Sequence, residues 1–290
     1  MNKAAALAGI LLMLLAFVHQ TAAAEDGKRP EKPMVLRISD RKVISFDRMI
    51  KEISGADIVL VGESHSSDAD HRAELAIIKA LHASVTPLAL GLEMFSSGSQ
   101  RELDGWVTGD IPLESFLKVY YDNWDMPWRL YSGILLFARQ VRMPVFGLNL
   151  PSEISNKVFR HGFGSLSPAE KKELPSGVTC TVDEEYKRYI KEMYSFHAGM
   201  GGRSFYDFCQ AQMLWDSVMA RNITENLKRS PGMKMVVLAG MGHAWKRGIP
   251  AQIRNISDYR YVVVLPAMPD GRAVDEITSA DADYVLLSPE

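Results

Sequence analysis

Short apolar runs alternate with longer stretches of helical periodicity along most of the chain. Buried strands of a parallel sheet are continuous apolar runs rather than alternating ones, because helices cover both faces of such a sheet. Runs of this kind occupy residues 57–61, 87–92, 144–148, 234–239 and 261–265. Runs separated by helical stretches are typical of a parallel sheet. The pattern therefore predicts an α/β fold with a mostly parallel sheet flanked by helices.

The stretches between the runs predict several helices. Residues 68–81 and 128–141 repeat apolar positions every three or four residues. A much longer helical stretch, about residues 151–230, separates the third run from the fourth, and its clearest helices are at 183–194 and 204–227. We interpret this stretch as a helical insert that forms either a lid or an accessory layer.

The first 24 residues have the pattern of a secretory signal peptide. Lys3 precedes an apolar run from Ala4 to Val18, and small residues lead up to Ala24. We expect cleavage near Ala24 and export of the mature chain. The run is shorter than the roughly 20 apolar residues of a membrane span. An uncleaved membrane anchor is the alternative. No cysteine lies near the cleavage site, so lipid attachment is not expected.

Composition adds few constraints. Residues 25–33 are polar and contain proline, which predicts a disordered lead-in. Residues 34–290 have the composition of an ordinary globular protein. We expect them to form one α/β domain, although their length would also fit two small ones. The net charge is −2 and no block of Lys or Arg stands out, so nucleic acid is not an expected partner. Cys180 and Cys209 are compatible with one disulfide, but their spacing alone does not decide between paired and free thiols.

Polar or ionisable side chains follow four of the five apolar runs. Glu63 and His65 follow the first, Glu93 the second, Asn149 the third and His243 the fourth. Ligands of open parallel sheets bind beyond the carboxyl ends of the strands, where such side chains meet. We therefore expect one polar site at this edge of the sheet.

The donor types at this edge leave the chemistry open. Glu63, His65, Glu93 and His243 supply oxygen and nitrogen ligands, which suit zinc, manganese or iron better than calcium or magnesium. The same groups could do acid–base work without a metal, or could merely cap helices and form an internal network. His71 either joins them or is a solvated helix residue. No Gly-x-Ser-x-Gly or Gly-x-Gly-x-x-Gly motif follows a strand, which argues against a serine hydrolase and a dinucleotide site.

Aromatic residues form a second feature, next to polar groups. The group comprises Tyr120, Tyr121, Trp124, Trp128 and Tyr131. Such clusters most often belong to a core, and the alternative is a platform for a flat ligand such as a porphyrin. Residues 194–202 hold His197 and Met200, which are side-chain types that ligate haem iron. A simple flexible connection is the alternative there.

Several short motifs together resemble the ChaN-like proteins. They are Gly62-Glu63-Ser64-His65 with the later His71, Leu92-Glu93-Met94, Gly242-His243-Ala244, Ala211-Gln212, Leu214-Trp215-Asp216 and Met219-Ala220. The ChaN-like proteins are bacterial, exported and linked to haem uptake, in a superfamily with the Tiki proteases and the erythromycin esterases. The resemblance extends over about residues 55–265 and implies a parallel α/β domain with a helical insert.

The resemblance also implies a function. It implies a periplasmic protein that binds haem through a tyrosine, as a homodimer around stacked haems, and that serves outer-membrane haem uptake machinery. Tyr131 is the first candidate ligand, because it lies in the helix before the third strand. Tyr121 is the second, and His197 could assist. The alternative is a metal-dependent hydrolase in which Glu63 or Glu93 is the general base. Whether the protein is an enzyme stays open.

Overall fold

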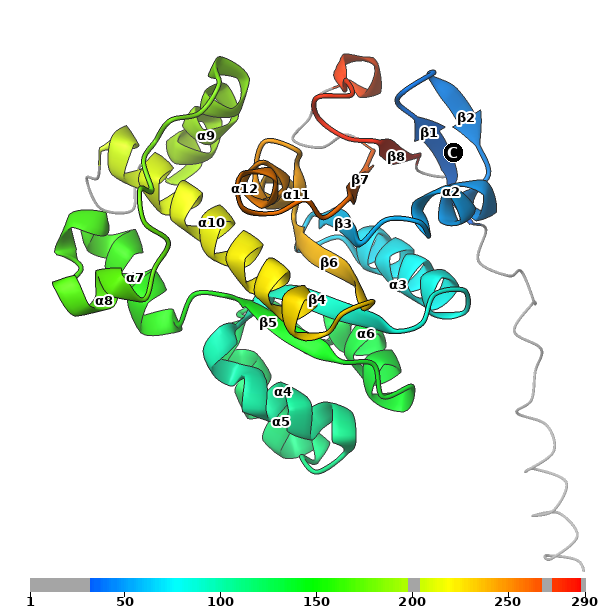
Figure 1. Ribbon diagram of the computed structural model, residues 1–290, viewed down its shortest axis with the longest axis horizontal. Coiled ribbons are helices and arrows are strands. Elements are labelled where there is room, and N and C mark those ends of the chain that lie inside the picture. Colours follow the sequence, from blue (N-terminus) through cyan, green and yellow to red (C-terminus); the bar gives the residue numbers. More distant parts are fainter. Residues whose placement is uncertain (1–31, 198–203, 268–272, 288–290) are drawn as a thin grey trace, which may run out of the picture. The chain divides into compact units, whose positions relative to one another are not determined.

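A computed structural model describes residues 32–197, 204–267 and 273–287. Its centre is an eight-stranded sheet with helices on both faces (Figure 1). The strands are β1 (Met34–Arg37), β2 (Lys42–Ile44), β3 (Ile58–Glu63), β4 (Leu88–Ser96), β5 (Val145–Asn149), β6 (Lys234–Gly240), β7 (Tyr261–Pro266) and β8 (Tyr284–Leu287). The expected α/β class is therefore confirmed.

The helices account for most of the remaining described residues. They are α2 (Phe46–Ile53), α3 (Asp68–His82), α4 (Gln100–Thr108), α5 (Leu113–Asn123), α6 (Trp128–Gln140), α7 (Ser152–His161), α8 (Pro168–Lys172), α9 (Glu184–His197), α10 (Phe205–Arg229), α11 (Met241–Ala244) and α12 (Ile249–Ile256). Short 3-10 turns occupy Ser97–Ser99, Phe163–Ser165 and Val274–Glu276. No helix in the described ranges is both long and apolar enough to cross a bilayer.

The strand order is β2-β1-β8-β7-β3-β6-β4-β5. The six strands from β8 to β5 pair in parallel, whereas β1 pairs with both β2 and β8 in antiparallel fashion. The five predicted runs correspond to strands β3, β4, β5, β6 and β7. The sheet is larger than those runs alone, because β1, β2 and β8 extend one side of it.

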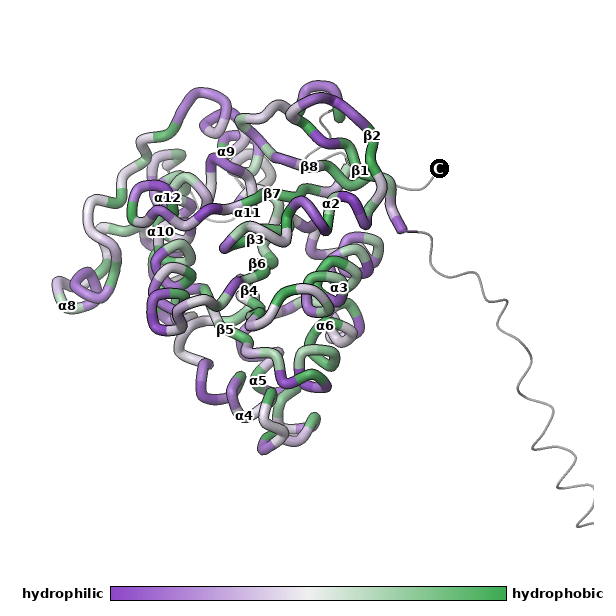
Figure 2. The backbone as a smooth tube through the Cα atoms, turned by 45° about the vertical axis from the view of Figure 1, so that its right-hand side comes forward, coloured by the Kyte–Doolittle hydropathy of each residue, from purple (hydrophilic) through white to green (hydrophobic). Residues whose placement is uncertain are grey.

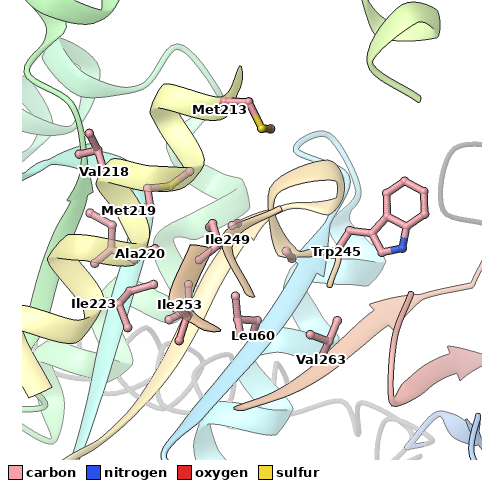
Figure 3. Packing of buried hydrophobic residues seen from close by; sticks show 14 of the residues in the cluster. Leu60, Met213, Val218, Met219, Ala220, Ile223, Trp245, Ile249, Ile253 and Val263 are labelled. Atoms are coloured by element: carbon pink, nitrogen blue, oxygen red, sulfur yellow. The ribbon is translucent and has the colours of Figure 1, made fainter. Parts of the chain in front are cut away.

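The two faces of the sheet carry separate hydrophobic clusters. Leu60 and Val263 lie on the face that α10 and α12 cover, in one cluster with Met219 and Ile253 (Figure 3). Val61 points to the other face, which is covered by α2, α3 and α4 to α6. Burial on both faces explains why β3 and β6 read as continuous apolar runs. In Figure 2 the central strands are largely hydrophobic, whereas helix α9 is largely hydrophilic.

Helices α7 to α10 lie between β5 and β6 in sequence. Helix α10 packs along β5 and α12, and contacts α9. A disulfide joins Cys180, in the segment before α9, to Cys209 on α10. The alternative that the sequence left open is therefore resolved in favour of a paired state. The pairing ties an otherwise irregular segment to the longest helix of the fold.

Candidate functional site

The carboxyl ends of β3, β4 and β6 bring the predicted polar residues together. Glu63 pairs in register with Gly240, and the backbone N–H of Gly240 donates to Oε2 of Glu93 at 2.6 Å. Nε2 of His243, just beyond β6, lies 3.6 Å from Oε1 of Glu93. His65 follows β3, and its charge interacts with those of Glu93 and His243. All four predicted residues thus lie close together at the same end of the sheet.

Glu63 is the inner member of the site, and its side chain is fully buried. Its Oε1 accepts from the hydroxyl of Tyr131 at 2.8 Å and lies 2.8 Å from Nδ1 of His65. Its Oε2 lies 2.5 Å from Nε2 of His71. Burial alone would raise the pKa of Glu63, but the hydrogen bond from His65 and the close positive charge of both imidazoles lower it to about 2. Glu63 is therefore a stable carboxylate.

Helix α3 adds a second buried carboxylate to this end of the site. Ser67 caps the helix by accepting from the N–H of Asp70, and one face of the following turns, with His71 and Glu74, is buried. His71 is buried with its ring centroid 4.3 Å from that of Tyr131. Glu74, one turn later, is 1 % exposed. Burial, reinforced by the negative charges of Glu63 and Asp70, raises the pKa of Glu74 well above its usual range.

His243 is held by Asp216 of the helical insert, and Asp216 is held in turn by Tyr186. Nδ1 of His243 lies 2.6 Å from Oδ1 of Asp216, on α10. The other oxygen of Asp216 accepts from the hydroxyl of Tyr186, on α9, at 2.8 Å. Burial would lower the pKa of His243, but the charges of Glu93 and Asp216 and the hydrogen bond to Asp216 raise it to about 9. The imidazole is therefore protonated at neutral pH.

Asp216 and Tyr186 complete the site and are absent from the candidates drawn from the strand ends. Both lie on helices far from the strand ends in sequence, so their place in the site depends on tertiary packing. Asp216 was visible only inside the Leu214-Trp215-Asp216 motif of the family resemblance. Its full burial next to Tyr186 raises its pKa, because the charged form loses water.

Most of the aromatic group belongs to the core. Tyr120 and Tyr131 are fully buried or nearly so, and the ring of Tyr120 contacts those of Trp128 and Phe95. Trp124 differs, because its ring lies edge-on to His65 with centroids 4.9 Å apart. Apart from the exposed Tyr121, the aromatic residues therefore form a core layer with one edge at the polar site.

Comparison with known proteins assigns the chain to a family. The model of the family described as "Haem-binding uptake, Tiki superfamily, ChaN" matches residues 49–253. The chain belongs to the ChaN family. Among solved structures, ChaN of Campylobacter jejuni, described with cofacial haem binding, is 23 % identical, with a TM-score of 0.70, over 90 % of this chain and 98 % of that one. No curated protein matches the chain.

Two other solved structures match the chain at lower identity and lower TM-score. An erythromycin esterase EreC mutant in its open conformation is 14 % identical, with a TM-score of 0.49, over 80 % of this chain and 76 % of that one. The type III effector HopBA1 has the same identity and TM-score over 83 % of this chain and 92 % of that one.

The haem-ligand candidates drawn from the ChaN resemblance differ in exposure. Tyr131 is 1 % exposed, and its hydroxyl donates to Glu63. Burial, and then the neighbouring Glu63 charge, raise the pKa of Tyr131, which disfavours the phenolate that ligates iron. Tyr121 is 50 % exposed at the end of α5, and its hydroxyl accepts from the N–H of Trp128 at 3.2 Å. The side chain of His197 lies outside the described residues, as does Met200.

Proposed function

We propose that this protein binds haem and serves haem uptake in the periplasm. The observation that carries the proposal is the match to the ChaN family over residues 49–253. The disulfide between Cys180 and Cys209 supports the location, because disulfides persist in oxidising compartments such as the bacterial periplasm. The C. jejuni relative, described with cofacial haem binding, supports haem as the ligand.

The haem binds, in this proposal, over the edge formed by the end of α5 and the turn after β3. Tyr121 ligates the iron there, because an iron ligand has to reach the porphyrin and its hydroxyl is exposed. Trp124 supplies a flat apolar surface, and the side chain of His65, 39 % exposed, gives a polar rim. These residue types fit a porphyrin, which is apolar over its faces and charged at its propionates.

A hemin titration of the purified protein tests the proposal. Saturable binding with the high-spin spectrum of tyrosinate-ligated iron is expected, and Tyr121→Phe should change that spectrum. Tyr206→Phe is the matched control, because Tyr206 on α10 is similarly exposed at 53 %. Absence of saturable binding would refute haem binding. A spectrum changed by Tyr206→Phe but not by Tyr121→Phe would move the haem to α10 and refute only the ligand assignment.

The proposal has two further parts. The protein forms a homodimer around stacked haems, and it delivers haem to or receives haem from outer-membrane uptake machinery. Sedimentation velocity with and without hemin tests the dimer, which should form or tighten when haem is added. Fusion of residues 1–40 to a reporter that folds only after export tests the location. A reporter that stays inactive would remove the periplasmic part of the proposal while leaving haem binding intact.

A further inference from the structure

Unpartnered polar atoms gather in one buried cluster behind the strand ends. In the part of the chain that the structure describes, six buried side-chain nitrogen or oxygen atoms have no hydrogen-bond partner. Five of them are Oε2 of Glu63, both ring nitrogens of His71 and both carboxylate oxygens of Glu74. Buried polar atoms of native proteins nearly always have a partner. This concentration in three adjacent side chains therefore points to a group that all three share.

The three side chains converge from two elements. Glu63 ends β3, whereas His71 and Glu74 lie three residues apart on one face of α3. One ligand atom from each of the three lies within 4.8 Å of the others. Tyr131 and His65 occupy Oε1 of Glu63, so that Oε2 is the oxygen left for the cluster. His71 Nε2 is 2.5 Å from that oxygen, but without hydrogen-bonding geometry.

Charge identifies the kind of group that fits. A buried carboxylate without a counter-charge costs several kcal/mol. Glu74 has neither a hydrogen-bond nor an ion-pair partner among the described residues, whereas Glu63 is balanced by His65 and His71. A proton on Glu74 would neutralise its charge but would leave the remaining acceptor atoms unsatisfied. One divalent cation would satisfy both carboxylates and the imidazole together. Two carboxylates and one imidazole are ligands that suit zinc, manganese or iron rather than calcium.

We propose that Glu63, His71 and Glu74 bind one divalent transition-metal ion in a closed site that fixes α3 to the end of β3. This set shares only Glu63 with the strand-end residues, and it does not depend on haem binding. Two ligands about 2.1 Å from a tetrahedral ion lie roughly 3.4 Å apart, so Glu63 and His71 have to separate by under about 1 Å. Burial of all three ligands excludes substrate and gives the ion a structural role.

Metal binding to haem-free protein, which lacks a Soret band, tests the proposal. After removal of metal with a chelator, the protein is titrated with Zn²⁺ by calorimetry and with Co²⁺ by visible absorption. We expect one ion per chain, Co²⁺ ligand-field bands and a higher Tm, because an ion that binds only the folded state stabilises it. Glu74→Gln should weaken binding at least tenfold and remove the bands.

Glu93→Gln is the matched control, because it removes a buried carboxylate of the same site that is not part of the cluster. It should keep one ion per chain. Glu74→Gln preserves the size and shape of the side chain, so the variant should fold. If it does not fold, His71→Ala gives the same readout. No binding at micromolar Zn²⁺ would overturn the proposal. An ion retained in Glu74→Gln and lost in Glu93→Gln would overturn it too and place the metal at the strand ends.

Discussion

The hydroxyl of Tyr131 donates a hydrogen bond of 2.8 Å to Oε1 of Glu63, and both side chains are almost completely buried. Helix α6 is thereby joined to the end of the central strand β3 by a charge-assisted bond. Such bonds are roughly twice as strong as neutral ones. The contact gives Tyr131 a role in holding the carboxylate, which is distinct from the iron ligation that the family resemblance implies.

Tyr131→Phe should destabilise the protein by about 1–3 kcal/mol and leave the haem spectrum unchanged. The lowered pKa of Glu63 contributes stability that is present above about pH 4.5 and is lost as the pH falls towards about 2. Loss of the donor raises that pKa, so acid unfolding of the variant should begin at a higher pH.

Urea unfolding across the acid range measures the effect of Tyr131→Phe. Tyr120→Phe is the matched control, because the buried Tyr120 hydroxyl donates to a backbone carbonyl, that of Met126. The control should lose some stability without a change in the acid profile. A haem spectrum altered by Tyr131→Phe would restore Tyr131 as the iron ligand.

The stability of the protein should decline as the pH rises above neutrality, because of His243. Its pKa of about 9 in the folded state exceeds the ordinary value of about 6.5. A raised pKa gives stability that is complete below the unfolded value and is lost as the pH rises through the folded one. The facing groups that set the shift are Glu93 and Asp216, with His65 nearby.

Denaturant unfolding between about pH 6 and 10 tests this decline. His243→Gln should be less stable near pH 6 and should show a flatter profile. His161→Gln, at an exposed position on α7, should keep the wild-type profile. A His243→Gln profile as steep as that of the wild type would show that other groups cause the decline.

Gly240→Ala should displace His65 without unfolding the protein. A Cβ at this position would lie 2.7 Å from Cε1 and 3.1 Å from Nε2 of the His65 ring. The ring is partly exposed and can swing outward, away from Glu63. Burial lowers the pKa of His65, but the hydrogen bond to Glu63 and the charges of Glu93 and Glu63 raise it overall. The displaced ring should therefore titrate closer to an ordinary histidine.

NMR titration of the His65 ring protons measures that shift. Gly55→Ala is the control, because a Cβ there would meet nothing within 4 Å. An unchanged His65 titration in Gly240→Ala would mean that the strand, rather than the ring, gives way.

Removal of the disulfide should cost about 3–4 kcal/mol of unfolding free energy. Cys180 and Cys209 are 29 residues apart, and the bond restricts that loop in the unfolded chain. The double variant Cys180→Ala with Cys209→Ala should show this loss in urea unfolding, and reductant should have no further effect on it. Equal stability of the variant and the oxidised wild type would contradict the prediction.

The central strands were predictable because they are buried on both faces. The runs at 57–61 and 234–239 coincide closely with β3 and β6, since nothing but a continuous apolar run fits such a position. Strands β1, β2 and β8 were not predicted. They are three or four residues long and lie at one side of the sheet, where partly exposed residues such as Val43 blur any pattern.

The residues of the candidate site were predictable only where they directly follow a strand of the sheet. Glu63, His65, Glu93 and His243 follow strands directly, so sheet topology alone brings them together. Glu74 lies inside an ordinary helical repeat, and only its position three residues after His71 on the inner face marks it. Asp216 reaches His243, and Tyr186 reaches Asp216, through the docking of separate helices, which no local pattern reveals. Tertiary packing, rather than periodicity, decides these positions.

Strand β3 lies between β6 and β7 in the sheet, although both strands come much later in the chain. Residues 64–233 separate β3 from β6. During synthesis β3 therefore lacks both of its pairing strands until nearly the whole chain has emerged. Until then both edges of an apolar strand stay open to other chains, and long-range pairings of this kind close slowly. An unfinished or truncated chain is therefore prone to aggregation. We expect that a chaperone binds the chain until β6 and β7 have been synthesised.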